Sequence, residues 1–182
     1  MSSKDIITQC APTLVGLKAG SIFNEHFDDK EVFFKEVSSF NARFKDKGIN
    51  MIPLSSTSNN ALLYVYRKKD LEKDFSNSIS KELLTNYGYD SNNVFSSIQK
   101  LRERLIDKTF PHEIGLFLGF PPEDVKGFID KNGQNYKSIG YWKVYGDEVQ
   151  AQNTFNKYHI FQKILLDRLN KGFNLKQLVI QK

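Results

Sequence analysis

The sequence has one cysteine, Cys10, and no apolar run long enough to cross a membrane. A single cysteine excludes an internal disulfide framework and a zinc site built on several cysteines, and it is typical of a reducing compartment. Asp5 and Gln9 interrupt the apolar core that an N-terminal signal peptide would need. Internal repeats, low-complexity tracts and linkers are also missing. These absences predict a soluble, cytoplasmic protein with no membrane partner.

The composition is globular, and the net positive charge comes entirely from the second half of the chain. The 182 residues are 40% hydrophobic and 13% aromatic, which is enough for one ordinary core, so we predict a single domain over 1–182. Residues 1–90 hold 12 basic and 12 acidic side chains. Residues 91–182 therefore carry the whole net charge of +5. Such a segment is typical of weak contact with anions, or simply of a solvated basic helix face.

Hydrophobic periodicity predicts helices around a small sheet. The clearest helix has an apolar stripe at three- and four-residue spacing, formed by Phe33, Val37, Phe40 and Phe44. Further helices are predicted over 3–15, 69–86, 91–108 and 148–171. Two strands, 50–56 and 61–67, flank a polar turn, and 141–145 is a third short strand. The pattern indicates the α+β class, with a small, mostly antiparallel sheet covered by several helices in a single domain.

The stretch 111–130, PHEIGLFLGFPPEDVKGFID, predicts two short helices joined by a tight turn. Its spacing also resembles a DNA-binding helix-turn-helix unit. The second helix, however, begins with Glu123 and Asp124, which phosphate would repel. The pattern therefore disfavours nucleic-acid binding here, and we expect any such binding to be weak, independent of sequence and due to the cations of 157–182. A core-forming helix pair is the simpler interpretation.

Cys10 and His112 are the two side chains that a neighbour could bring to titrate near neutral pH. His112 at a helix N-terminus would suit a general base, with Glu113 or Asp124 orienting it and Cys10 as nucleophile. The alternatives are a partly buried structural histidine and a small buried cysteine. His112 and Glu113 are adjacent, so on a helix they point about 100° apart and do not form a metal site. Lys18 is the candidate cation near Cys10.

Four stretches of the chain resemble one known family. They are CAPTLVGLKAGSIF (10–23), LLYVYR (62–67), the stretch 111–130 and YWKVYGDE (141–148). In this order they are similar to the bacterial domain-of-unknown-function family 3793, which is common in clostridia. The resemblance covers nearly the whole chain. The resemblance implies a cytosolic, single-domain protein. It also implies a redox or iron link, with a flavodoxin-like redox protein or a small molecule as partner.

The same resemblance supplies candidate site residues. It implies Cys10, His112 and Glu113 as catalytic candidates. Its motifs contain the ligand-binding candidates Lys18, Tyr64, Arg67, Asp124, Lys143 and Tyr145. Many members carry further cysteines before the tryptophan and in the last helix, where this chain has SIGYW and KYHIF. We therefore expect no metal site, and the sequence identifies no cofactor.

Three functions follow from these observations. The first is a small-molecule or redox/iron-linked site built around Cys10 and His112. The second is an adaptor or interaction protein without chemistry of its own. The third is nucleic-acid binding through the helix pair or the basic tail.

Overall fold

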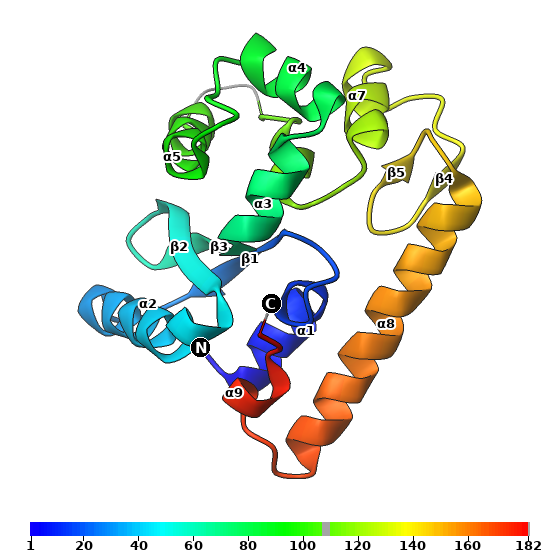
Figure 1. Ribbon diagram of the computed structural model, residues 1–182. Helices are drawn as coiled ribbons and strands as arrows, with labels where there is room; N and C mark the ends of the chain where they lie inside the picture. The colour runs from blue at the N-terminus through cyan, green and yellow to red at the C-terminus, as the bar shows by residue number, and fades with distance from the viewer. Residues whose placement is uncertain (107–109, 182) are drawn as a thin grey trace. The chain divides into compact units, whose positions relative to one another are not determined.

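The computed structural model describes residues 1–106 and 110–181 (Figure 1). The last residues of the helix predicted over 91–108, and Lys182 of the basic tail, lie outside this range. The chain divides into two compact units, which we call unit 1 (Met1–Lys69 and Phe161–Lys182) and unit 2 (Asp70–Ile160). The combination of a small antiparallel sheet with many helices confirms the α+β class and is consistent with a single α+β domain. That both units unfold together stays a prediction.

Unit 1 contains a three-stranded antiparallel sheet in the order β1-β3-β2. Its strands are β1 (Gly20–His26), β2 (Ile49–Ser56) and β3 (Asn60–Arg67). A tight turn joins β2 to β3, and the Thr57 N–H donates to the Asn60 carbonyl at 2.8 Å. β2 and β3 confirm the two predicted strands. β1 was not predicted, and it makes β3 the central strand.

Helices α1 (Ser3–Leu14) and α2 (Lys30–Phe44) pack against this sheet, α1 on β1 and β3 and α2 on β2. The Asp29 carboxylate begins α2 by accepting from the Val32 N–H at 2.9 Å. After the short 3-10 helix η1 (Lys45–Lys47), Gly48 adopts a φ of 69° and leads into β2. All four residues of the predicted aromatic stripe are buried: Phe33, Val37, Phe40 and Phe44.

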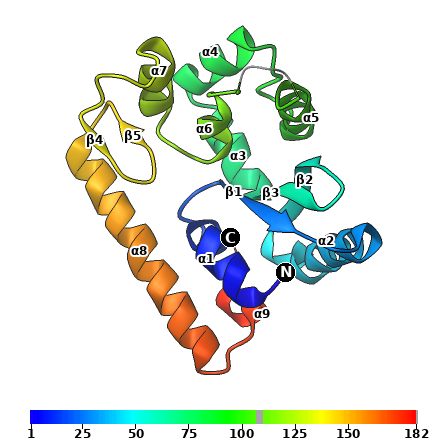
Figure 2. The same cartoon turned by 180° about the vertical axis from the view of Figure 1, so that it is seen from behind.

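The C-terminal end of the chain packs beside α1 in unit 1 (Figures 1 and 2). Helix α8 (Glu148–Asn170) is followed by the single turn α9 (Leu175–Leu178). Asn174 and Gln177 form a capping box at the start of α9. Beyond it, the Ile180 N–H donates to the Leu14 carbonyl at 3.3 Å. This contact joins residues far apart in sequence into one core.

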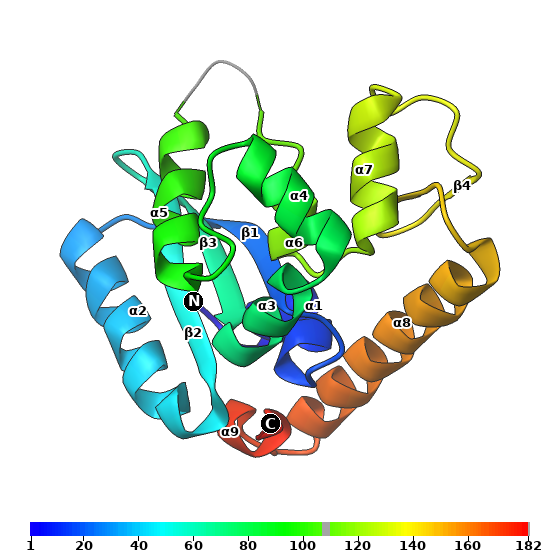
Figure 3. The same ribbon diagram turned by 45° about the horizontal axis from the view of Figure 1, so that its top comes forward.

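Unit 2 is mainly helical (Figure 3). Its elements are most of α3 (Lys68–Phe75), α4 (Ser78–Asn86), α5 (Val94–Arg104), α6 (Ile114–Phe117), α7 (Pro122–Asp130), the strands β4 (Ser138–Ile139) and β5 (Lys143–Val144), and the first part of α8. The single helix predicted over 69–86 is wrong. Asn77 interrupts it, because its side chain accepts from the N–H groups of Ile79 and Ser80 and begins a new helix.

The stretch 111–130 forms two short helices, as predicted, with Gly119 at a φ of 70° between them. The first is shorter than expected, since α6 begins only at Ile114 and leaves Pro111 and His112 in the preceding turn. The short strand predicted over 141–145 is confirmed in part: β5 covers Lys143–Val144 and pairs with β4 in a small hairpin.

Candidate functional site

Cys10 lies in α1 inside the core of unit 1, with none of its surface exposed. Burial raises the pKa of its thiol to about 12, although the charge of Lys18 and a hydrogen bond with Ser21 act in the opposite direction. The pKa of half-buried Lys18 is lowered to about 8, mainly by burial. A thiol in this environment is protonated at neutral pH. Cys10 therefore has the surroundings of a structural cysteine.

His112 and Glu113 belong to unit 2, so they are not in the compact unit that contains Cys10. His112 is exposed, whereas Glu113 is buried and accepts hydrogen bonds from the Tyr89 hydroxyl, at 2.8 Å, and from Arg104 Nε. Burial, together with Glu113, raises the pKa of Tyr89 well above its usual range. Glu113 thus ties α5 to the 111–118 segment. It does not orient His112, and the geometry gives the predicted cysteine–histidine site no support.

Tyr64 and Arg67, two ligand-binding candidates on β3, are both buried in unit 1. The Tyr64 ring stacks on that of Tyr66, with centroids 5.0 Å apart. The Arg67 guanidinium donates to main-chain carbonyls of Thr13 (2.7 Å), Leu14 (2.8 Å), Ile180 (2.9 Å) and Lys47 (3.1 Å). Arg67 therefore joins β3, α1 and the C-terminal segment. These contacts are structural, and a ligand role for either residue stays a prediction.

Asp124, a third candidate, is the anchor of the hairpin in unit 2. Its Oδ2 accepts from Trp142 Nε1, and its Oδ1 accepts from the N–H groups of Tyr145 and Gly146, each at 2.7 Å. A side chain at Gly146 would place a Cβ 3.0 Å from Glu123 Cγ, so glycine allows the close approach. Asp124 accordingly fixes the segment 141–146 against the start of α7.

Lys143 and Tyr145 belong to a group of aromatic rings and lysines on unit 2, which we call the lysine–aromatic surface. Its members are Phe110, His112, Phe128, Lys131, Tyr136, Lys143 and Tyr145. Ring centroids are 5.9 Å apart for Phe110 and His112 and 5.0 Å for His112 and Phe128. Lys143 Nζ lies 5.7 Å from the centre of the Phe128 ring and 4.7 Å from that of Tyr136.

The lysines of this region have main-chain and aromatic contacts in place of ion pairs. Lys143 Nζ donates to the Gly133 carbonyl at 2.8 Å, and Lys137 Nζ donates to the Gly146 carbonyl at 2.7 Å. Lys131 Nζ lies 5.3 Å from the centre of the Tyr145 ring. Within residues 1–106 and 110–181, none of these three lysines has a carboxylate within ion-pair distance. Their charge is therefore available to an anion.

Tyr145 contributes a buried hydroxyl that has no hydrogen-bond partner among the described residues. Burial raises the pKa of Tyr145, so its hydroxyl is protonated at neutral pH and remains a donor. Two glycines shape its surroundings. A Cβ at Gly127 would lie 2.6 Å from Tyr145 Cβ, and one at Gly133 would lie 3.1 Å from the Phe128 ring. Gly127 thus lets Tyr145 pack against the main chain of α7, and Gly133 does the same for the Phe128 ring.

The lysine–aromatic surface as a whole was missed in the sequence, although one signal was present. The segment 131–146, KNGQNYKSIGYWKVYG, has three lysines, four aromatic residues and no acidic residue. Phe110 and His112 have no such signal, because they approach the segment through tertiary packing, and Phe128 precedes it by three residues at the end of α7.

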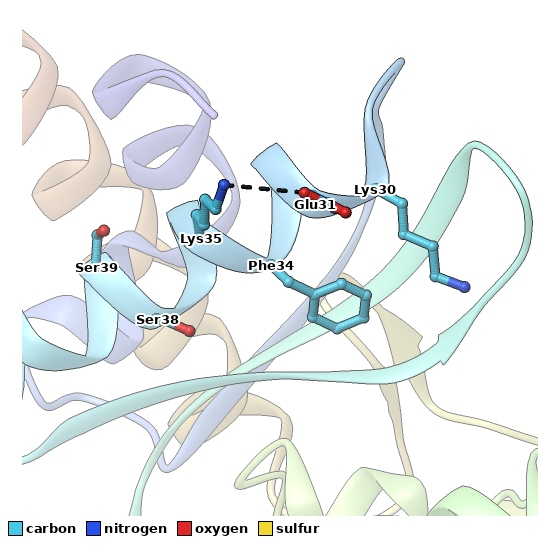
Figure 4. Close-up of a pocket in the computed structure, with 6 residues that line it drawn as sticks. All are labelled: Lys30, Glu31, Phe34, Lys35, Ser38 and Ser39. Atoms are coloured by element: carbon cyan, nitrogen blue, oxygen red, sulfur yellow. Dashed lines mark ion pairs between the residues drawn. The ribbon is translucent and has the colours of Figure 1, made fainter.

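An open groove of about 690 Å³ on unit 1 is a weaker candidate (Figure 4). It is lined by α2 residues of both charge signs around the exposed Phe34 ring: Lys30, Glu31, Phe34, Lys35, Ser38 and Ser39. Figure 4 shows Lys35 directed toward Glu31, and their charged atoms are 4.0 Å apart. Such mixed and paired charges favour no particular ligand.

Two kinds of feature are absent from the described residues. In the part of the chain that the structure describes, no three His, Cys, Asp or Glu side chains form a group that could hold a metal ion. Over the same residues, no helix has the length and apolar character needed to cross a bilayer.

Comparison with known proteins agrees with the motif resemblance. The model of a family described as "Protein of unknown function (DUF3793)" matches residues 6–179. No curated protein and no solved structure matches the chain. The matched segment covers nearly all of unit 1, the whole of unit 2 and every residue of the lysine–aromatic surface. The chain belongs to the DUF3793 family.

Proposed function

We propose that this protein is an interaction protein that binds an anionic partner on the lysine–aromatic surface and performs no chemistry of its own. The observation that carries the proposal is that Lys131, Lys137 and Lys143 have no ion-pair partner among the described residues. Lys131 and Lys143 lie beside aromatic rings, and Lys137 donates to the Gly146 carbonyl. A cation beside a ring and a carbonyl keeps its charge and much of its capacity to bind an anion.

The side chains that would supply chemistry have other roles. Cys10 is buried in the core of unit 1, and Glu113 binds Tyr89 and Arg104. The redox or iron link and its flavodoxin-like partner rest on the family resemblance alone, and the geometry gives a site with Cys10 and His112 no support. An interaction role needs only the exposed surface.

Retention on immobilised heparin, a polyanion, tests the proposal. The variant Lys131→Gln/Lys143→Gln removes two charges from the surface. The matched control Lys157→Gln/Lys163→Gln removes two charges from exposed positions of α8. We expect the surface variant to elute at clearly lower salt than the wild type, and the control to elute close to it. Equal shifts for the two variants would show that only net charge matters and would refute the proposal.

A further inference from the structure

We infer that the partner bound by the lysine–aromatic surface is a single-stranded nucleic acid, an inference that rests on the proposed function. Unpaired bases stack on exposed rings, while the phosphates between them lie near lysines. This chemistry is shared by RNA and DNA strands. It requires rings with open faces, cations that are not neutralised, and little negative charge nearby.

The rings meet the first requirement. Phe110 is 54% exposed and Tyr136 is 40% exposed, and His112 is also exposed. Phe110, His112 and Phe128 follow one another at centroid distances of 5.9 and 5.0 Å. Lys143 then lies between Phe128 and Tyr136. Alternation of rings and cations over several residues is the arrangement that single-strand binding uses, and stacking tolerates any base because every base has a π face.

The lysines meet the second requirement, and the third is met within the segment 131–146 itself. No acidic residue occurs in 131–146. Of the carboxylates next to this segment, Asp130 pairs with Lys126 at 3.2 Å, and Asp124 is buried under three donors. Glu123, at the start of α7, remains exposed at the edge beside Gly146. Asp147 and Glu148, which directly follow the segment, are exposed as well, and Asp147 accepts a hydrogen bond from the Gln150 N–H. The three lysines of the segment have no paired carboxylate among the described residues, so their charge can attract the phosphates of a strand.

The same features argue against a duplex and against the basic tail. In a duplex the bases are stacked on each other, so their faces are not available to Phe110 or Tyr136. Helix α7 still presents Glu123 at its N-terminus, where groove readout would begin. In the tail, Lys171 pairs with Asp167 at 2.7 Å and Lys176 with Asp46 at 3.2 Å. The sequence predicted that the cations of 157–182 would account for any nucleic-acid binding. Two of these cations are neutralised by ion pairs.

Fluorescence anisotropy with labelled oligouridylate, oligothymidylate, a duplex of equal length and a polyglutamate peptide tests the inference. The variant Phe110→Ala/Tyr136→Ala removes two rings and no charge. Phe95→Ala, which removes a 68% exposed ring from α5, is the matched control. We expect both single strands to bind, the ring variant to lose about fivefold or more in affinity, and the control to lose none. Tyr136→Phe should bind as the wild type does, which separates stacking from a structural loss.

Two outcomes overturn the inference while leaving the proposed function intact. In the first, heparin retention falls in the Lys131→Gln/Lys143→Gln variant, but the Phe110→Ala/Tyr136→Ala variant binds oligonucleotides as tightly as the wild type. The other is tighter, ring-dependent binding of the polyglutamate peptide, which would identify an acidic protein segment as the partner. If the Lys131→Gln/Lys143→Gln variant elutes from heparin at the same salt concentration as the wild type, the proposed function itself is refuted. The affinity for the strands should also fall with salt, with a slope that is about 1.4 smaller in the Lys131→Gln/Lys143→Gln variant.

Discussion

Replacing Asp124 with asparagine would set two hydrogen-bond donors against each other in the core of unit 2. Asp124 Oδ1 accepts from two main-chain N–H groups, and Oδ2 accepts from the Trp142 indole N–H, all at 2.7 Å. An asparagine that keeps its single oxygen on the main chain must turn its NH₂ group toward the indole N–H. The substitution therefore weakens two hydrogen bonds and replaces the third with an unsatisfied contact.

The size of the effect follows from typical values. Hydrogen bonds to charged groups contribute about 1.5–3 kcal/mol, and neutral ones about 1 kcal/mol. The Asp124→Asn loss is then about 3–5 kcal/mol, partly offset because a side chain that is 3% exposed no longer buries a charge. The coupling free energy between Asp124 and Trp142 is more informative than either single loss. Because Trp142→Phe removes the opposed donor, we expect the double variant to be about 1–3 kcal/mol more stable than additive losses would make it.

Urea unfolding followed by far-UV circular dichroism gives the four free energies of unfolding for this cycle. Asp130→Asn is a suitable control, because its exposed carboxylate pairs only with Lys126, and its loss should be within about 0.5 kcal/mol. Strictly additive losses for Asp124 and Trp142 would show that their hydrogen bond does not stabilise the hairpin. Asp124 would then again be a free ligand-binding candidate, as the motif resemblance implied.

Other consequences of the packing can be measured directly. Cys10 should react with a thiol reagent at pH 7 about a thousandfold more slowly in the native protein than in the unfolded chain, because burial raises its pKa from 9.0 to about 12; rates within about tenfold of each other would contradict this. Phe40→Ala should lower the free energy of unfolding by about 3–5 kcal/mol, since the ring is buried against Phe44; a loss below about 1 kcal/mol would refute the assigned core. Gly127→Ala should destabilise the protein, although alanine usually stabilises a helix by about 1 kcal/mol, because the new Cβ would lie 2.6 Å from Tyr145; a gain in melting temperature would exclude that clash. Limited proteolysis under native conditions should release no stable fragment of half the chain if both units form one domain.

Local patterns predicted most of the fold. The stripe that includes Phe33 and Phe44 predicted α2, because helical periodicity is set by neighbours three and four residues apart. The strands β2 and β3 were predictable for a similar reason, since a tight turn pairs them. β1 was missed because its partner strand lies about forty residues away, and its pattern of partly exposed side chains resembles a loop.

The sequence by itself determined most of the helices, the turn between β2 and β3, and the net positive charge of the second half of the chain. Tertiary structure alone decided which chemistry-bearing residues meet. Cys10 and His112 were the most reactive residue types available, yet one became a core residue of unit 1 and the other an exposed ring on unit 2. Residue type sets what a side chain can do, but burial and neighbours set its pKa and its access to a ligand. Those neighbours come from parts of the chain that local patterns do not connect.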